Sequence, residues 1–185
     1  MDPVAAAFAA TPRAGFLPRR GRRRARYDGP LDIGHGQTNS QPRTVEAMLQ
    51  LLEVRRGQHV LDVGAGSGWT TALLAHLVGP RGSVCGVELL PELAAWGAAN
   101  LAAAERPWAS IVEARPGVLG LPEHAPYDRI LVSAEADELP DPLVAQLADG
   151  GRLVVPVAGR MLLVRPRHGD VQVTEHGYYR FVPLL

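Results

Sequence analysis

The sequence contains no lysine, a single cysteine and no long apolar run, and each of these absences narrows what the protein can be. With Cys85 alone, the chain cannot form an internal disulfide or bind zinc through a cluster of thiolates. No segment has the roughly 18 consecutive apolar residues that a membrane-spanning helix needs. The first residues also lack the basic leader of a secretory signal, so we expect a cytoplasmic protein with no membrane partner.

Length and composition predict one globular domain. Of the 185 residues, 46% are hydrophobic and 21% are charged, which excludes a largely disordered chain. This length allows one sizeable core but not two full domains. We therefore expect a monomer with a single domain over residues 1–185, in which residues 1–40 form an N-terminal arm and lid segment and residues 41–185 form an α/β core.

The formal net charge is zero, but the charges are distributed unevenly along the chain. All 19 basic residues are arginines, and seven of them lie between Arg13 and Arg26 with no acidic residue among them. Such a tract binds phosphates or acidic peptides in some proteins and is a solvated loop in others. Because the rest of the chain is acidic on balance, we expect no nucleic-acid partner.

The N-terminal part predicts two helices separated by an arm. Residues 3–11 are rich in alanine up to Pro12, and residues 12–30 combine proline, glycine and arginine in the manner of a loop. Ser40 then stands as a candidate N-cap, with Pro42 in the first turn of the second helix. The apolar residues of that helix recur in steps of three and four, at Val45, Met48, Leu49 and Leu52.

From residue 59 onward, strand-like and helix-like segments alternate. We expect strands at residues 59–63, 83–89, 110–114, 127–133, 152–157, 161–165, 171–174 and 179–182, and helices at 69–78, 92–105 and 142–148. The alternation indicates a doubly wound, mostly parallel α/β sheet, and the closing strands without helices between them indicate an antiparallel C-terminal edge. Ligands of such sheets bind beyond the carboxyl ends of the strands, here among the loops at 64–68, 88–90, 115–120 and 133–139.

A glycine-rich loop at Gly64, Gly66 and Gly68 follows the first of these strands and precedes a helix. Glycines let the backbone approach a ligand, and the helix start offers free N–H groups. The loop is not a dinucleotide fingerprint, because Trp69 stands where a third glycine would be required. It is not a phosphate-binding loop of the Walker type either, because no lysine follows it. With Asp62 beside it, the loop suits an adenosyl amino acid better than a pyrophosphate.

Glu88 ends the next strand, where an acidic side chain can accept hydrogen bonds from both hydroxyls of a ribose. Asp62 could face the ammonium group of the same ligand, directly or through water. The alternative interpretation is that both acids only cap turns. Their joint placement around the loop resembles the class I S-adenosylmethionine (SAM) methyltransferases.

A more specific resemblance lies upstream, in residues 30–42, which read PLDIGHGQTNSQP. This segment resembles the signature of the protein-L-isoaspartate O-methyltransferases, above all in Gly36-Gln37-Thr38 and Ser40. The resemblance continues in order through most of the chain, at residues 11–18, 121–128, 146–153 and 180–184.

The resemblance implies transfer of a methyl group from SAM to the free α-carboxylate of L-isoaspartyl residues in proteins or peptides. The ester then closes to a succinimide, which reopens in part to normal aspartate. By position, Ser40 corresponds to the active-site serine of the family, and Gln37, Thr38 and Asn39 line the cofactor and substrate. The remaining SAM contacts are expected at Asp62, Gly64, Ala65, Gly66, Gly68, Glu88, Leu89, Pro116 and Gly117.

Little acid–base chemistry is needed for such a transfer. A carboxylate is already ionised at about pH 7, and the sulfonium is already activated, so alignment and exclusion of water remain. The hydroxyl of Ser40 could hold the incoming carboxylate, could only cap the helix, or could do both. We expect His35 to be a loop residue and not a base.

Several positions depart from the family pattern. Asn39 stands where isoleucine is usual, Arg115-Pro116-Gly117 replaces a Gly-Asp-Gly segment, and Glu135 and Asp137 replace small residues. The family also often continues beyond the position of Leu185. These departures suggest two readings besides simple compensation by neighbours. One is a carboxyl methyltransferase dedicated to an aspartate or isoaspartate of one maturing peptide, in which the arginine tract could dock an acidic leader. The other is a SAM-binding module without turnover.

Overall fold

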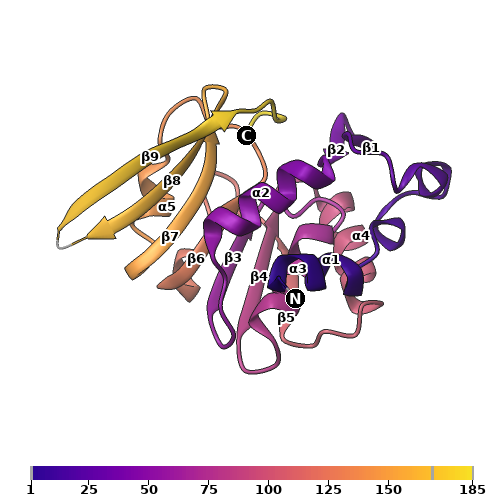
Figure 1. The fold of residues 1–185 in the computed structure, drawn as a ribbon, viewed down its shortest axis with the longest axis horizontal. Coiled ribbons are helices and arrows are strands. Elements are labelled where there is room, and N and C mark those ends of the chain that lie inside the picture. The colour runs from indigo at the N-terminus through magenta and orange to yellow at the C-terminus, as the bar shows by residue number, and fades with distance from the viewer. Residues whose placement is uncertain (1, 168, 185) are drawn as a thin grey trace.

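A seven-stranded sheet runs through the centre of the molecule (Figure 1). The computed structural model describes residues 2–167 and 169–184. The strands of this sheet are β3 (His59–Val63), β4 (Ser83–Glu88), β5 (Ala109–Glu113), β6 (Tyr127–Val132), β7 (Leu147–Val157), β8 (Arg160–Arg167) and β9 (Asp170–Tyr178). Their order in the sheet is β5-β4-β3-β6-β7-β8-β9. Pairs from β5 to β7 are parallel and the last two pairs are antiparallel, which confirms the predicted fold class.

Two β-strands and eight helical segments surround the sheet in the described residues. The strands β1 (Leu31–Gly34) and β2 (Gln37–Asn39) form a separate antiparallel hairpin. The α-helices are α1 (Pro3–Ala10), α2 (Pro42–Leu52), α3 (Trp69–Val78), α4 (Pro91–Ala102) and α5 (Asp141–Val144). Three 3₁₀ helices, η1 (Arg13–Phe16), η2 (Arg19–Arg24) and η3 (Pro122–His124), complete the set.

Apolar side chains on the two faces of the sheet form separate cores. Val60 packs into a cluster with helices α1 to α4, whereas its neighbour Leu61 packs into a cluster with Leu143 of α5 and Leu121. Adjacent strand residues point to opposite faces, so a strand buried on both sides contributes to both cores. This explains why the parallel strands have nearly continuous apolar sequences.

Helix α2 forms where its apolar pattern predicted, but its N-cap is Gln41 and not Ser40. Val45, Met48, Leu49 and Leu52 are all buried against the sheet. Pro42 occupies the first helical position, which suits its fixed φ and missing N–H group, so the residue directly before it becomes the cap. Ser40 lies one residue further upstream, outside the helix.

Three other sequence-based assignments were wrong in detail. The helix expected at 142–148 is a single turn, because β7 already begins at Leu147, which pairs with Tyr127. The strand expected at 179–182 does not form, since β9 ends at Tyr178. The arm at 12–30 is not all loop but contains η1 and η2.

The segment after β9 instead crosses to the loop that follows β6. The backbone N–H of Glu135 donates to the carbonyl of Val182 at 2.7 Å, and the N–H of Leu184 donates to the carbonyl of Glu135 at 2.7 Å. The end of the described chain is thereby held beside the carboxyl ends of the central strands. None of the helices in the described residues combines the length and hydropathy that would cross a bilayer.

Candidate active site

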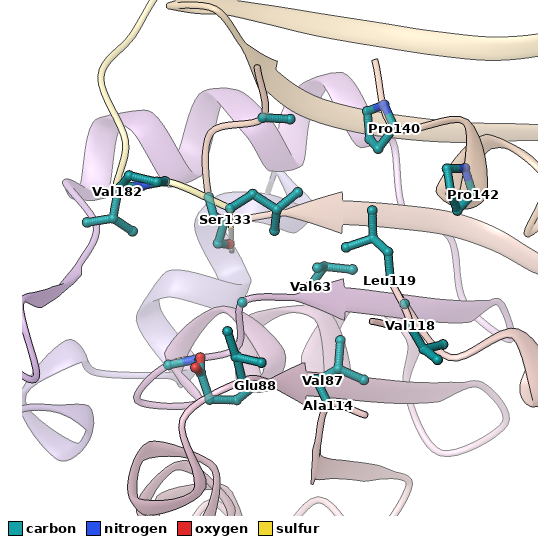
Figure 2. Close-up of a pocket in the computed structure, with 18 of the residues that line it drawn as sticks. Val63, Val87, Glu88, Ala114, Val118, Leu119, Ser133, Pro140, Pro142 and Val182 are labelled. Atoms are coloured by element: carbon teal, nitrogen blue, oxygen red, sulfur yellow. The ribbon is translucent and has the colours of Figure 1, made fainter. Parts of the chain in front are cut away.

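A cavity of about 640 Å³ opens beyond the carboxyl ends of the parallel strands (Figure 2). Its wall includes the residue that ends or follows each of four strands: Gly64, Glu88, Ala114 and Ser133. Small-molecule sites usually measure about 300–1,000 Å³ and lie at this edge of open α/β sheets. The position therefore agrees with the crevice that the sequence predicted.

The glycine-rich loop after β3 forms part of the cavity wall. Gly64 and Gly66 line the cavity with φ angles of 81° and 52°, and Gly68 follows with φ 83°. Gly68 faces away from the cavity, where a Cβ atom would lie 2.7 Å from the carbonyl oxygen of Gly97 on α4. The loop thus needs glycine for two reasons: a left-handed backbone on the cavity side and close packing on the helix side.

The carboxylate of Glu88 is fixed at the cavity wall by backbone donors. One oxygen accepts from the N–H of Gly66 at 2.8 Å, and the other accepts from the N–H of Leu90 at 3.1 Å. The residue is 8% exposed, and Figure 2 shows its side chain on the side of the cavity opposite Pro140. Glu88 can therefore present acceptor oxygens to a ligand without having to reorient.

Asp62 does not reach the cavity. It is fully buried in β3, and one of its oxygens accepts from the hydroxyl of Thr71 at 2.6 Å while the other has no partner among the described residues. Burial, with a smaller contribution from the charge of Glu88, raises its pKa to about 7 against the lowering effect of the hydrogen bond from Thr71. Asp62 can therefore act on the cavity only through the loop that follows it.

The β1–β2 hairpin covers one side of the cavity. Gln37 and Thr38 line the cavity, together with Ile33 from the other strand. Ile33 lies close over the glycine loop, because a Cβ atom on Gly66 would be 3.4 Å from its Cδ1 atom. This hairpin was not predicted as a strand pair, since only Leu31, Asp32 and Ile33 alternate between apolar and polar and all three residues of β2 are polar.

Asn39 faces away from the cavity and joins three segments of the chain. It is 5% exposed, its amide nitrogen donates to the hydroxyl of Ser67 at 2.9 Å, and its amide oxygen accepts from Nε of Arg13 at 2.6 Å. The N-terminal arm, the hairpin and the glycine loop are therefore connected by one buried side chain. Nothing in the sequence signalled this bridge, because its partners are 26 and 28 residues away.

Arg13 is the buried cation of this network. Its guanidinium also donates to the carbonyls of Tyr27, Gly29, Asn39 and Ser40, at 2.8–2.9 Å. Burial lowers its pKa to about 10, partly offset by the charge of Asp28. The group remains charged at neutral pH, so it holds the backbone on both sides of the predicted serine.

The predicted site residues fall into two groups. Those that line the cavity are Gln37, Thr38, Gly64, Gly66, Glu88, Leu89 and Gly117. Those outside its lining are Asn39, Ser40, Asp62, Ala65, Gly68 and Pro116. Ser40 is half-buried and directly follows the cavity-lining part of the hairpin, with its carbonyl held by Arg13.

Sequence reasoning missed two parts of the wall. Val118 and Leu119 contribute apolar surface, and Val182 to Leu184 cover the side next to Ser133. The first pair carries only a short apolar signal, and of the second segment only Val182 had been assigned, as the end of a strand. Of the two acids that replace small residues of the family, Asp137 lines the cavity, whereas the carboxylate of Glu135 accepts from the N–H of Phe181 at 3.3 Å.

The fold and the site together define a class of protein. A glycine-rich loop follows the first parallel strand, an acidic side chain ends the second, and the cavity between them lies beside a covering hairpin. These are the features of a class I SAM-dependent methyltransferase with a Rossmann-like fold and an antiparallel C-terminal edge.

Comparison with known proteins narrows the class to a family. The family model for protein-L-isoaspartate(D-aspartate) O-methyltransferase (PCMT) matches residues 1–185. The chain is 46% identical over 187 residues to the protein-L-isoaspartate O-methyltransferase of Aeropyrum pernix, covering 98% of this chain and 72% of that protein. It is 44% identical over 184 residues to that of Methanothrix thermoacetophila, covering 98% and 87%. The chain belongs to the protein-L-isoaspartate O-methyltransferase family.

Two solved structures share the fold. A protein-L-isoaspartate O-methyltransferase superposes with a TM-score of 0.90 at 27% identity, over 100% of this chain and 61% of that one. An S-adenosyl-L-homocysteine complex from Plasmodium falciparum superposes with a TM-score of 0.88 at 24% identity, over 100% and 91%. The second likeness concerns the fold alone.

Proposed function

We propose that this protein transfers the methyl group of SAM to the free α-carboxylate of L-isoaspartyl residues in proteins or peptides. Succinimide formation and repair of the isoaspartyl link follow from that ester. The observation that carries the proposal is the fixed carboxylate of Glu88 beside the glycine loop, in a cavity of about 640 Å³. Membership of the family supplies the substrate class.

The residues of the cavity fit an adenosyl amino acid. Glu88 offers acceptor oxygens for the ribose hydroxyls, and Gly64 and Gly66 leave room for the amino-acid part, because no side chain projects from them. Leu89 and Gly117 also line the cavity, and we propose that they enclose the base. When bound, SAM supplies a methyl group on a sulfonium, which is already an activated electrophile.

Asp62, Ala65, Gly68 and Pro116 support this site from outside the cavity. Asp62 ties β3 to α3 through Thr71, and Gly68 lets the loop pack against α4. Because burial favours the neutral acid, Asp62 is not proposed to pair with the ammonium group of the ligand. Ala65 and Pro116 each stand between two residues that line the cavity. We therefore propose that Asp62 and Gly68 shape the glycine loop and do not touch the cofactor.

Alignment of the carboxylate is the main task left to the protein. The substrate carboxylate is ionised at about pH 7, so it requires no general base. Gln37 and Thr38 can donate hydrogen bonds to it from the hairpin, and Ser40 is the proposed catalytic residue at the end of that segment. Arg13 holds the carbonyls of Asn39 and Ser40, which keeps the segment in place as a substrate arrives.

We also propose that residues 1–40 act as a cover over residues 41–185 within one domain. The connection from Arg13 through Asn39 to Ser67 supports this division of roles. A monomer in the cytoplasm, acting on protein or peptide substrates and not on nucleic acid or membranes, is the setting that we propose.

Methyl transfer to two isomeric peptides tests the proposed function. Radiolabelled SAM is incubated with the protein and with an isoaspartyl peptide or its aspartyl isomer. We expect label in the isoaspartyl peptide only. Equal labelling of both isomers would contradict the proposal, and so would tight binding of SAM by calorimetry with no labelling of either peptide, which is the behaviour of a module without turnover.

The role of Ser40 is tested by Ser40→Ala. We expect the SAM dissociation constant to stay nearly unchanged and the turnover number to fall by about tenfold or more, because one hydrogen bond to a charged group is lost. Ser110→Ala on β5, outside the cavity lining, is the control. Full turnover in Ser40→Ala would mean that the serine has no part in the transfer.

A further inference from the structure

The arm between Arg19 and Arg26, here called the arginine arm, is a dense positive surface. It contains six arginines and no acidic residue, and the 3₁₀ helix η2 at Arg19–Arg24 has no buried residue. Among the described residues, Arg20 is the only arginine of the arm with an ion pair, and that pair is exposed. Arg22 donates through Nε to the carbonyl of Leu17 at 3.2 Å, and the guanidinium of Arg24 lies over the ring of Tyr27. Neither contact neutralises a positive charge, so the arm can still attract negative charges from outside the molecule.

The arginine arm is fixed to one wall of the cavity. Leu17, just before the arm, packs with Leu31 and Ile33 of the hairpin in a small apolar cluster. Arg20 pairs with Asp32, the neighbour of Ile33, and Ile33 itself lines the cavity. Apolar packing and one ion pair thus hold the positive charges beside the cavity.

The opposite wall of the cavity is acidic. Asp137, Glu138 and Asp141, here called the acidic rim, line the cavity and are exposed to solvent. None of the three forms an ion pair among the described residues, and Arg115, which also lines the cavity, is already paired with Glu123 at 2.6 Å. Backbone hydrogen bonds of Ala136 with Pro156 and Ala158, both 3.0 Å, fix the start of this rim.

The two charged surfaces lie on different sides of the cavity. The hairpin that holds the arm packs with Leu90 and Leu93 at the start of α4, directly after β4. The acidic rim follows β6, and β4 and β6 flank β3 on opposite sides in the sheet. Figure 2 shows Pro140, which stands between Glu138 and Asp141 in the chain, across the cavity from Glu88 of β4.

We infer that this enzyme selects isoaspartyl peptides by the charges that flank the reacting residue, and this inference rests on the proposed function. Acidic residues on one flank meet the arginine arm, and basic residues on the other flank meet the acidic rim. An extended peptide advances about 3.3 Å per residue, so positions two to four residues from the isoaspartate lie about 7–13 Å from it, and these are the positions that we expect to meet the two surfaces. Complementary charges raise the rate of productive encounter and fix the direction in which the peptide lies.

Three peptides with one isoaspartyl core test the inference. One has neutral flanks, one has acidic residues before and basic residues after the isoaspartate, and one has the reverse order. We expect kcat/KM for one charged peptide to exceed that of the neutral peptide by about three- to tenfold and the other to fall below it. This difference should vanish between about 0.02 M and about 0.5 M ionic strength, because the charges are exposed.

Two sets of variants assign the preference to its surfaces. The arm variant combines Arg22→Gln, Arg23→Gln and Arg24→Gln, and it should remove the contribution of the acidic flank of the peptide. The rim variant combines Asp137→Asn and Glu138→Gln, and it should remove the contribution of the basic flank. The matched control replaces three exposed arginines at the other end of the sheet, Arg55→Gln, Arg56→Gln and Arg81→Gln. It changes the net charge equally and should leave the ratio between the two charged peptides as it was.

The outcomes separate this inference from the proposed function. Equal kcat/KM for both charged peptides, with discrimination between isoaspartyl and aspartyl peptides intact, would overturn the inference alone. An equal loss of preference in the arm variant and in its matched control would also overturn it. Absence of methyl transfer to every isoaspartyl peptide would instead overturn the proposed function.

Discussion

At the scale of single residues, Glu88 has a side chain that the backbone of the protein itself holds in position. Two backbone N–H groups already hold its carboxylate at the cavity wall. Preorganised acceptors of this kind bind a ligand without first losing conformational freedom. The binding of SAM should therefore depend strongly on this one carboxylate.

Glu88→Gln should raise the dissociation constant of SAM by about tenfold or more, because hydrogen bonds to a charged acceptor are worth about 1.5–3 kcal/mol. Calorimetric titration measures the change. Glu113→Gln is the control. Glu113 lies opposite Glu88 in the register of the neighbouring strand β5, but it does not line the cavity. If both variants bind SAM as tightly as the parent, Glu88 has no contact with the ribose.

Asp62 gives a pH dependence of stability that follows from its burial. Its pKa rises from 3.8 in the unfolded chain to about 7 in the folded protein, so the folded state holds the proton more tightly. Stability therefore falls as the pH rises through the window from about 4 to 7, where only the folded state is protonated. Above about pH 7, Asp62 is ionised in both states and causes no further change in the free energy of unfolding.

Asp62→Asn keeps an acceptor for Thr71 and removes the titration. Without SAM, we expect the free energy of unfolding of the parent to drop between pH 5 and pH 8 relative to that of the variant, as measured by urea titration. The difference should have this sign because burial favours the neutral acid. Parallel pH profiles for the two proteins would show that Asp62 does not titrate in this range.

At the scale of elements, the parallel strands and helices could be predicted, but the covering segments could not. Short, mostly apolar stretches such as His59–Val63 mark buried strands, and apolar residues spaced by three and four mark α2. The β1–β2 hairpin carries no such pattern, since Gln37 and Thr38 serve the cavity and Asn39 serves a buried hydrogen-bond network. The segment after Tyr178 has strand-like residues, yet its partner is the backbone of Glu135, which no local pattern can indicate.

The same limit applies to the site. The glycines and Glu88 were predictable, because strand ends of a parallel sheet meet at one edge. The buried positions of Asp62 in β3 and Asn39 in β2 were not, because a sequence pattern does not tell which face of a strand a polar side chain takes relative to the cavity. Ser40 was expected to cap α2, but the rigid ring of Pro42 moves the helix start past it.

The connection between the hairpin and the glycine loop can be tested through Asn39→Leu. Leucine has a similar size but leaves Arg13 and Ser67 each without one buried partner, so we expect a loss of about 1–3 kcal/mol in the free energy of unfolding. We also expect a lower turnover number, even at temperatures well below the unfolding temperature, because the segment before Ser40 loses its anchor. The comparison is Asn100→Leu, which removes a bond to the carbonyl of Ser67 from α4 and leaves the hairpin untouched. A stability loss in both variants with unchanged turnover in Asn39→Leu would assign the anchor to folding only.

At the scale of the whole molecule, one edge of the sheet gathers everything that the chemistry needs. The parallel strands bring the glycine loop and Glu88 to that edge. The β1–β2 hairpin, from the N-terminal part of the chain, covers one side of the cavity, and Val182 to Leu184, from the C-terminal part, cover another. Segments from the N-terminal and C-terminal parts of the described chain therefore line one cavity. Enclosure of this kind excludes water and aligns the reacting atoms, which is what transfer from a sulfonium to a carboxylate requires.

The most direct test of this account is the location of the transferred methyl group. SAM carrying a ¹³C-labelled methyl group is incubated with the protein and an isoaspartyl peptide, and the product is fragmented in a mass spectrometer. We predict the label on the α-carboxylate of the isoaspartyl residue, followed by its loss as labelled methanol when the succinimide forms. Label on any other group of the peptide, or an isoaspartyl residue that never becomes esterified, would contradict the account.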